Sequence, residues 1–309
     1  MNIYHQDDIP CSPLEQLFQN NARPELQKIR DNTYDWSRQP LWQRHMPCSR
    51  TNRERRRGII TALCDDPYQD PEAADIGLAI LHCRKRYPCG SPLCDFCRTR
   101  RQDDREQEAR QLFGHLPRQR LAFLTILTDV SYHPNTEVQY RIEELRQKVR
   151  SLRSSRFKDV RVFGAVEVDV KFPKLDLRRA RSKEVLEGLG MYDLRKEAYL
   201  VHLHAIVDLN GVSKDALGRW FRRSFPKKYQ VRLAGLRNHH PTATSVANLT
   251  RYMLKFRAQE ADNLWGNKPD GQAKYGSLYP DATLRFFSRC LHKINRKPGF
   301  GSFYLTYNA

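Results

Sequence analysis

The middle of the chain holds a series of β-strand-like stretches separated by helical patterns. Three stretches are rich in β-branched and aromatic residues: "RLAFLTILTDV" at 120–130, "DVRVFGAVEVDVKF" at 159–172 and "YLVHLHAIVDL" at 199–209. Helical spacing of apolar residues over 138–154 separates the first two, and a helix at 213–225 and a strand at 229–234 follow the third. The order β-α-β-β-α-β is typical of a ferredoxin-like, split βαβ sheet with the third stretch at its centre. We therefore predict an α+β fold with an antiparallel sheet and helices.

The charge of the chain indicates the chemistry of its partner. Lysine and arginine number 54 against 35 acidic residues in 309, which gives a formal net charge of +19. A surplus of this size favours a polyanion, and nucleic acid is the usual one. No apolar run is long enough to span a membrane, and the N-terminal "MNIYHQDDIP" does not have the pattern of a signal peptide. We therefore expect a nucleic-acid-binding protein of the bacterial or host-cell cytoplasm, without a membrane partner.

Four of the eight cysteines lie within fifteen residues, in "HCRKRYPCGSPLCDFCRTRRQ". They are Cys83, Cys89, Cys94 and Cys97, the last two in a C-x-x-C pair that brings two thiolates onto one ion. In a cytosolic chain such a cluster favours a structural Zn²⁺ over disulfides. The spacing is irregular, so His82 or Cys64 could replace one ligand. Redox thiols or unrelated buried cysteines are the alternative.

Two histidines interrupt the apolar strand at 199–209. His202 and His204 are one residue apart, so both point to the same face of the sheet. Glu167 lies inside another apolar strand, where a carboxylate is costly unless it is paired or metal-bound. We predict that the three bind one divalent ion, and imidazole with carboxylate suits Mn²⁺ or Mg²⁺. The alternatives are hydrogen-bonded histidines and an edge-strand carboxylate that faces water.

The pattern of 242–259, "TATSVANLTRYMLKFRAQ", predicts a helix with a threonine or serine cap at its start. Tyr252 and Lys255 are three residues apart and would share a face of this helix. Taken alone, the pair is also typical of an amphipathic helix whose lysine extends to solvent.

A further stretch, "GRWFRRSFPKKYQVR" at 218–232, alternates aromatic residues with cations. Such a mixture suits single-stranded DNA, where cations contact phosphates and rings stack on bases. An ordinary helix that buries its rings and exposes its arginines explains the pattern equally well. The candidate DNA-binding residues are Arg219, Trp220, Arg222, Arg223, Lys227 and Lys228.

We divide the chain into four predicted segments. Residues 1–78 form a basic arm with short helices at 22–32 and 54–64, either loosely ordered or bound to phosphates, and without a continuous core pattern. Residues 79–117 form the cysteine-rich module, whose very polar helix at 98–112 would lie on the surface or on DNA. Residues 118–260 form the sheet domain. Residues 261–309 form a basic cap with a Gly/Asn/Pro-rich loop, a helix at 281–294 and a final strand.

Over about 120–260, the order of three motifs resembles the HUH endonucleases, and in particular the single-tyrosine rolling-circle replication initiators of plasmids and phages. "FLTILT" is similar to their first, hydrophobic-threonine motif, and "HLHAIV" to the His-hydrophobic-His motif that names the superfamily. "YMLKF" is similar to the motif that carries the nucleophilic tyrosine. Some of these initiators also have a basic cysteine cluster before the first motif, as this chain has.

The resemblance implies sequence-directed nicking and rejoining of single-stranded DNA through a 5′-phosphotyrosine, which initiates rolling-circle replication of a plasmid, phage or integrated element. Tyr252 would be the nucleophile and Lys255 would assist it. The implied partners are single-stranded or cruciform origin DNA, a host helicase and a second copy of the chain. Where some relatives have a glutamate or second tyrosine one turn before the nucleophile, this chain has Asn248. An HUH transposase and, in another class, a non-catalytic zinc-containing DNA-binding regulator are the alternatives.

Overall fold

The computed structural model describes residues 24–35, 50–84, 86–172, 180–193, 195–236, 240–256, 258, 278–294 and 303–308. Residues 1–23 and 36–49 of the predicted N-terminal arm and the whole of the predicted Gly/Asn/Pro-rich loop at 266–276 lie outside these residues. Contacts divide the chain into two compact units. The first is Met1–Cys89 with Pro280–Arg289, and the second is Gly90–Tyr279 with Cys290–Ala309.

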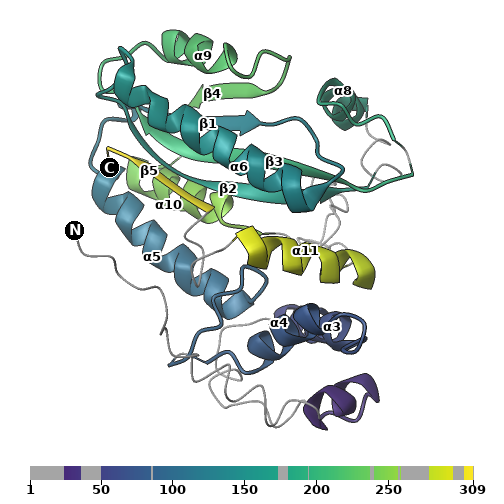
Figure 1. The fold of residues 1–309 in the computed structure, drawn as a ribbon. Helices are drawn as coiled ribbons and strands as arrows, with labels where there is room; N and C mark the ends of the chain where they lie inside the picture. The colour runs from purple at the N-terminus through teal and green to yellow at the C-terminus, as the bar shows by residue number, and fades with distance from the viewer. Residues whose placement is uncertain are drawn as a thin grey trace, which may run out of the picture. The chain divides into compact units, whose positions relative to one another are not determined.

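The second unit is built on a five-stranded antiparallel sheet (Figure 1). Its strands are β1 (Leu121–Leu127), β2 (Arg161–Lys171), β3 (Ala198–Asp208), β4 (Val231–Gly235) and β5 (Tyr304–Tyr307). Their order across the sheet is β4-β1-β3-β2-β5, so β3 lies between β1 and β2, as in a split βαβ arrangement. The predicted α+β class and antiparallel sheet are confirmed, with the histidine-bearing strand at the centre.

Two helices cover one face of this sheet. In α6 (Pro134–Arg150), proline occupies the first turn, where its missing N–H costs nothing. This helix runs across the sheet (Figure 1) and buries Val138, Ile142, Leu145 and Val149, which recur at helical spacing. In α9 (Lys214–Arg222), the Ser213 hydroxyl accepts the N–H of Ala216, and Leu217 and Phe221 are buried. Trp220 of α9 contacts Lys148 of α6, which places the two helices side by side.

The opposite face carries α5 (Asp95–Phe113), α8 (Ala180–Gly188) and α10 (Thr242–Met253). Phe113 of α5 packs edge-on against Phe163 of β2, with ring centres 6.1 Å apart. Leu186 of α8 shares an apolar cluster with Leu200 of β3. Because Leu200, His202 and His204 alternate along β3, they share this face, and the histidines lie next to the part of it that α8 covers.

Helix α5 is polar and yet packs against α10. Gln102 donates to the carbonyl of Leu254 at 3.0 Å, and Arg98 donates to that of Lys255 at 3.3 Å. Arg251 of α10 forms ion pairs with Asp103 and Glu106 of α5. The contact of α5 with α10 therefore includes hydrogen bonds and ion pairs, which an apolar periodicity cannot reveal.

The first unit contains a helix at 24–30, α3 (Arg50–Cys64) and α4 (Pro71–Leu81). The Asp70 carboxylate caps α4 by accepting the N–H of Ala73 at 3.1 Å. Ile60 and Leu63 are buried, and a β-carbon at Gly77 would stand 2.6 Å from Cys64 Sγ, so the helices pack closely where glycine has no side chain. From the sequence we predicted no continuous core in this region and no helix at 71–81. The buried residues and α4 show that both predictions were wrong. The last helix, α11 (Asp281–Ile294), matches its prediction.

Among the described residues, we find no helix with the length and apolar character needed to cross a membrane.

Candidate functional site

Glu167 of β2 and His202 of β3 are direct partners in the register of the two strands, so their side chains project from the same face. His204 lies two residues along β3 and shares this face. Each residue offers one ligand atom, and the three atoms lie within 4.8 Å of one another. All three residues are buried, with at most 6% of their surface exposed. The structure thus brings together the three predicted metal ligands, in a group that could hold a metal ion; we call it the carboxylate–histidine group.

The hydrogen bonding of this group is incomplete. Glu167 Oε2 lies 3.1 Å from His202 Nε2. Glu167 Oε1 and His202 Nδ1 are buried and have no hydrogen-bond partner within the described part of the chain. Buried polar atoms in native proteins nearly always have a partner, because an unpaired one costs about 1–3 kcal/mol. A cation next to the group would supply the missing interaction for the carboxylate, so the residues present fit a divalent metal.

The protonation of His202 depends on its neighbours. Burial favours the neutral ring, but the hydrogen bond with Glu167 and the negative charges of Asp169 and Glu167 outweigh it and raise the pKa of His202 above its ordinary value. A cation bound to these acids would favour the neutral ring again.

His204 is oriented by two residues of β1. Thr125 faces it in the register, and Thr125 Oγ1 lies 3.1 Å from His204 Nδ1, within hydrogen-bonding distance. If Nδ1–H donates to this hydroxyl, Nε2 keeps its lone pair for a metal. Phe123 stacks on the His204 ring, with centres 5.6 Å apart and an interplanar angle of 13°. The sequence reading assigned no role to either residue, because their position opposite His204 depends on the strand register.

Arg232 was also missed. It is the partner of Thr125 on the other side of β1, so it projects from the face that carries the carboxylate–histidine group. Its side chain is exposed. It brings a positive charge to this face on the edge strand β4.

The predicted nucleophile lies beside this group. The Tyr252 ring meets the His204 ring edge-on, with centres 5.1 Å apart, and it also packs against Phe123. Lys255 Nζ lies 3.8 Å from the centre of the Tyr252 ring. Tyr252 is 40% exposed, which leaves it accessible to a ligand. The predicted catalytic pair, Tyr252 and Lys255, is thus next to the predicted metal ligands.

The helix that carries Tyr252 begins at Thr242, as predicted, but it differs from its prediction in its cap and in its end. Pro241 precedes it without a side-chain hydrogen bond, so the predicted threonine or serine cap does not form. It ends at Met253 rather than at 259, and Lys255 lies beyond it. The physical reason is that side chains of α5 bond the carbonyls of Leu254 and Lys255. Lys255 nevertheless reaches Tyr252, and Asn248 is exposed one turn before the tyrosine.

The predicted DNA-binding residues separate into two sets. Arg219, Trp220, Arg222 and Arg223 belong to α9 and its end, on the sheet face opposite the carboxylate–histidine group. Lys227 and Lys228 lie in the loop before β4 and form ion pairs with Asp129 and Glu184, both at 2.9 Å. The structure therefore does not bring the α9 arginines to Tyr252.

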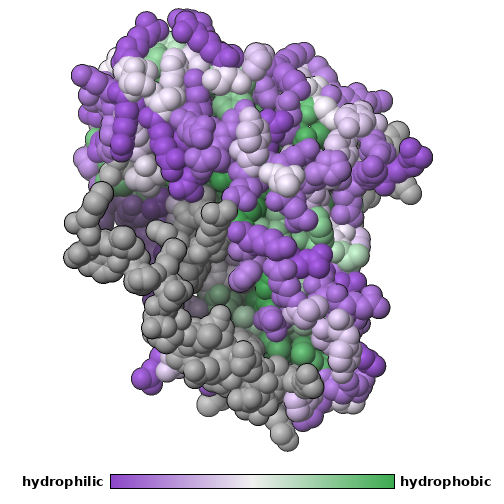
Figure 2. All heavy atoms as spheres, in the orientation of Figure 1, coloured by the Kyte–Doolittle hydropathy of each residue, from purple (hydrophilic) through white to green (hydrophobic). Residues whose placement is uncertain are grey.

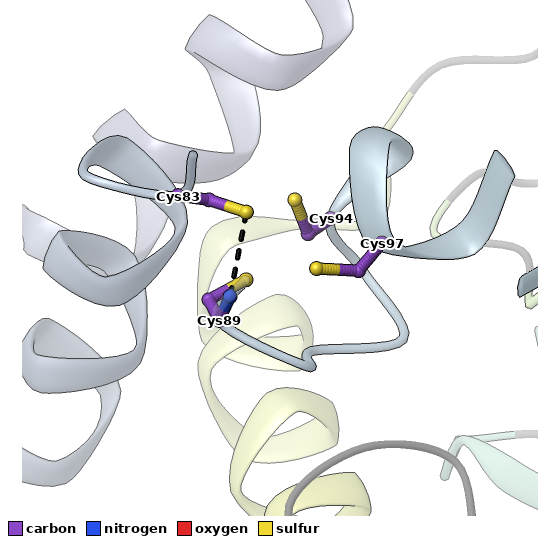
Figure 3. Close-up of side chains that lie close together, drawn as sticks. All are labelled: Cys83, Cys89, Cys94 and Cys97. Atoms are coloured by element: carbon purple, nitrogen blue, oxygen red, sulfur yellow. Dashed lines mark hydrogen bonds between the residues drawn. The ribbon is translucent and has the colours of Figure 1, made fainter. Parts of the chain in front are cut away.

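The four predicted zinc ligands form a second group (Figure 3). The sulfur atoms of Cys83, Cys89, Cys94 and Cys97 lie within 4.8 Å of one another and point toward a common centre. Cys83 Sγ accepts the N–H of Cys89 at 3.4 Å, and Cys97 Sγ accepts that of Gly90 at 3.2 Å. Backbone N–H groups aimed at sulfur favour the thiolate form that binds metals. Four converging cysteine sulfurs fit a tetrahedral ion.

The two substitute ligands considered from the sequence have other partners. His82 Nε2 lies 2.7 Å from Glu25 Oε2. Cys64 is buried, and burial raises the pKa of its thiol to about 12, which keeps it protonated. Neither residue belongs to the four-cysteine group.

Comparison with family models, with curated proteins and with solved structures finds no match for this chain. The carboxylate–histidine group and the four cysteines are therefore the features that indicate its chemistry.

Proposed function

We propose that this protein is a metal-dependent endonuclease and strand transferase of the HUH type, which nicks and rejoins single-stranded DNA to initiate rolling-circle replication of a plasmid, phage or integrated element. The observation that carries the proposal is the position of Tyr252. Its accessible ring lies 5.1 Å from the His204 ring, which belongs to a buried group with the composition of a divalent-metal site. A nucleophile beside a cation site is what phosphodiester cleavage requires.

Glu167, His202 and His204 would hold Mg²⁺ or Mn²⁺ through one carboxylate and two imidazoles. When bound, such an ion withdraws charge from a phosphate and makes its phosphorus a better electrophile. Thr125 and Phe123 fix the His204 ring, so that this ligand does not have to be ordered when the substrate binds.

Tyr252 Oη would attack the phosphorus of the scissile phosphodiester. The new bond joins the tyrosine oxygen to phosphorus, and the bond between phosphorus and the 3′ oxygen breaks. The phenolic proton goes to solvent, and the leaving 3′ oxygen gains a proton from solvent. One ester replaces another, so the bond energy is conserved and the 3′-hydroxyl can reverse the step. Lys255, whose ammonium lies over the Tyr252 ring, would stabilise negative charge on the phenolate and the phosphate.

The four cysteines would hold a structural Zn²⁺ that orders residues 83–97. A non-catalytic zinc-containing DNA-binding regulator would use this group too. Such a regulator gives no account of why Glu167 and His202 keep buried polar atoms that find no partner among the described residues, beside an accessible tyrosine. A transposase of the same superfamily would use the same residues on element ends and differ only in the DNA that it cuts. The proposal also includes origin DNA, a host helicase and a second copy of this chain as partners, with the cytoplasm as the compartment.

The test is incubation of the protein with single-stranded DNA and Mn²⁺ or Mg²⁺, followed by a denaturing gel. We expect a covalent protein–DNA adduct and a free 3′-hydroxyl fragment with wild-type protein, and neither with Tyr252→Phe. Tyr192→Phe is the matched control, because Tyr192 is 81% exposed and lies in the loop before β3. Cleavage by Tyr252→Phe at the wild-type rate would show that Tyr252 is not the nucleophile. No metal-dependent adduct with any single strand, including those from cruciform DNA, would reject the nuclease.

A further inference from the structure

A strongly cationic surface lies on the sheet face that α6 and α9 cover. Its members come from α9, from the end of α6 and from the segment that joins α6 to β2. They are Lys148, Arg153, Arg156, Lys158, Arg219, Arg222 and Arg223, all exposed except Lys148, which is half-buried. Figure 2 shows that the visible surface of this region is largely hydrophilic. We call these residues the α9 cationic surface.

The two chain segments of this surface lie side by side. The Trp220 ring packs edge-on against Phe157, with centres 5.8 Å apart, and Lys148 Nζ lies 3.5 Å from the Trp220 ring centre. Burial, aided by the positive charge of Arg223, lowers the pKa of Lys148. The contribution of Arg223 shows that positive charges lie close together on this surface. Their mutual repulsion lowers the stability of the fold unless an anion compensates it.

The arginines of α9 have no acidic partners within the described residues. Among the residues that the structure describes, Arg219, Arg222 and Arg223 form no ion pair, whereas the nearby Lys227 and Lys228 are paired with Asp129 and Glu184. Two acidic residues of α6 pair with arginines of their own helix: Glu144 pairs with Arg141, and Glu143 pairs with Arg150. The α9 arginines are therefore available to an external anion.

The rings within this surface are not available for base stacking. Phe157 and Phe221 are buried, and Trp220 is half-buried beneath Lys148. Single-strand binding requires rings on which bases can stack, whereas duplex DNA offers mainly its phosphates to lysine and arginine. The composition of the α9 cationic surface therefore fits a duplex backbone better than a single strand.

We infer that the α9 cationic surface binds the phosphate backbone of duplex DNA next to the strand that is cut, on the sheet face opposite the carboxylate–histidine group. The choice of DNA as the partner rests on the proposed function. The sheet separates this surface from Tyr252, so the cut strand and the duplex would occupy different faces of the second unit. Contacts to phosphates alone carry no sequence information, so this surface would supply affinity and orientation, and the site around Tyr252 would select the strand.

The experiment compares two double variants, Arg222→Gln with Arg223→Gln and, as the matched control, Lys227→Gln with Lys228→Gln. Each removes two positive charges from the same stretch of chain. Affinity for a random-sequence duplex is measured by fluorescence anisotropy over a range of salt concentrations, and cleavage is measured on a short single strand. We expect the arginine variant to reduce the slope of log affinity against log salt by about two, at about 0.9 per lost phosphate contact. Its single-strand cleavage should stay at the wild-type rate.

Equal loss of duplex binding in both double variants would overturn the inference, because a diffuse charge effect would then suffice. Loss of single-strand binding and cleavage in the arginine variant, with its fold shown intact by circular dichroism, would also overturn it and place α9 on the path of the cut strand. If wild-type protein cleaves no DNA but its duplex affinity depends on Arg222 and Arg223, the nuclease proposal fails and the duplex-binding surface stands.

Discussion

Gly164 of β2 lies so close to His204 of β3 that a β-carbon at position 164 would stand 2.5 Å from the carbonyl oxygen of His204. Real β-carbons essentially never approach backbone this closely, so an alanine there would push the two central strands apart. The candidate metal ligands Glu167 and His202 face each other across the same pair of strands. The spacing of this site thus depends on a residue that has no side chain.

We predict that Gly164→Ala destabilises the protein by about 1–3 kcal/mol, the usual cost of overpacking, and weakens Mn²⁺ binding. Gly235→Ala on the edge strand β4 is the control, because a β-carbon at Gly235 meets nothing within 4 Å. Urea unfolding and calorimetric titration with Mn²⁺ measure the two effects. If the two variants have the same free energy of unfolding and the same Mn²⁺ affinity, the structure accommodates a β-carbon at position 164 and the prediction is wrong.

Replacement of Glu167 by glutamine should reduce Mn²⁺ affinity by more than tenfold, or about 1.4 kcal/mol. Glutamine has nearly the same size but lacks the charge that attracts a cation. Mn²⁺ at about ten times the wild-type dissociation constant should therefore raise the melting temperature of wild-type protein clearly more than that of Glu167→Gln. Glu184→Gln, at an exposed carboxylate of α8, should respond to Mn²⁺ as wild type does. An Mn²⁺ response that persists in Glu167→Gln would remove Glu167 from the ligand set.

Asp208, at the end of β3, is fully buried between two arginines. Arg120 and Arg161 approach its Oδ2 to 2.7 Å and 2.8 Å. Burial opposes the charged form, but the hydrogen bonds from Arg120 and Arg161 outweigh it and lower the pKa of Asp208. A lowered carboxyl pKa contributes stability that is present above its unfolded value, about 3.9, and is lost as the pH falls through the folded value.

The expected cost of Asp208→Asn at neutral pH is about 1–3 kcal/mol, the usual cost of losing hydrogen bonds to a charged group, because both arginine partners are partly exposed. The difference from wild type should shrink below a pH of about 4, where the Asp208 carboxyl of the unfolded chain begins to be protonated while that of the folded protein is still charged. Chemical unfolding at several pH values measures the free energy of unfolding of each protein, with Asp215→Asn, at an exposed residue, as the control. A difference that is independent of pH would mean that packing, not charge, accounts for the loss.

For the cysteine group, we expect purified protein to contain one zinc ion per chain. Cys94→Ser should lose most of it, because a hydroxyl is a poor zinc ligand at neutral pH. Cys64→Ala should keep it, because Cys64 lies outside the group and its thiol stays protonated. Elemental analysis of wild-type protein and of both variants measures the zinc content per chain. Equal zinc contents of the two variants, or no zinc in wild-type protein, would contradict the assignment.

The parts of the site that follow from short-range periodicity could be predicted from the sequence. Alternation placed His202 and His204 on one face, and the order of the elements placed their strand at the centre of the sheet. The strand register, by contrast, decides that Thr125 faces His204 and that Glu167 faces His202, and it depends on contacts between distant segments. The end of α10 at Met253 is likewise decided by α5, more than a hundred residues earlier in the chain.

The same reasoning explains the missed packing in the first unit. Glycine has a low helix propensity, so Gly77 counts against a helix in the sequence. In the structure, Gly77 is the point at which α4 approaches α3. A close approach of this kind is a property of two helices together and has no signature in either one.

The central position of β3 has a consequence for the motions of the site. From His202 to Asp208, β3 is hydrogen-bonded on both sides, to β1 and to β2. Amide protons in such a strand exchange with solvent only when the whole unit unfolds, whereas those at the end of a helix exchange through local fraying. We therefore expect the amide protons of His202 and His204 to be among the slowest to exchange in the second unit, whereas Tyr252 lies one residue before the end of α10. If Tyr252 carries the cut DNA as proposed, the candidate metal ligands lie in a central strand, and the residue bound to the DNA lies near the end of a helix.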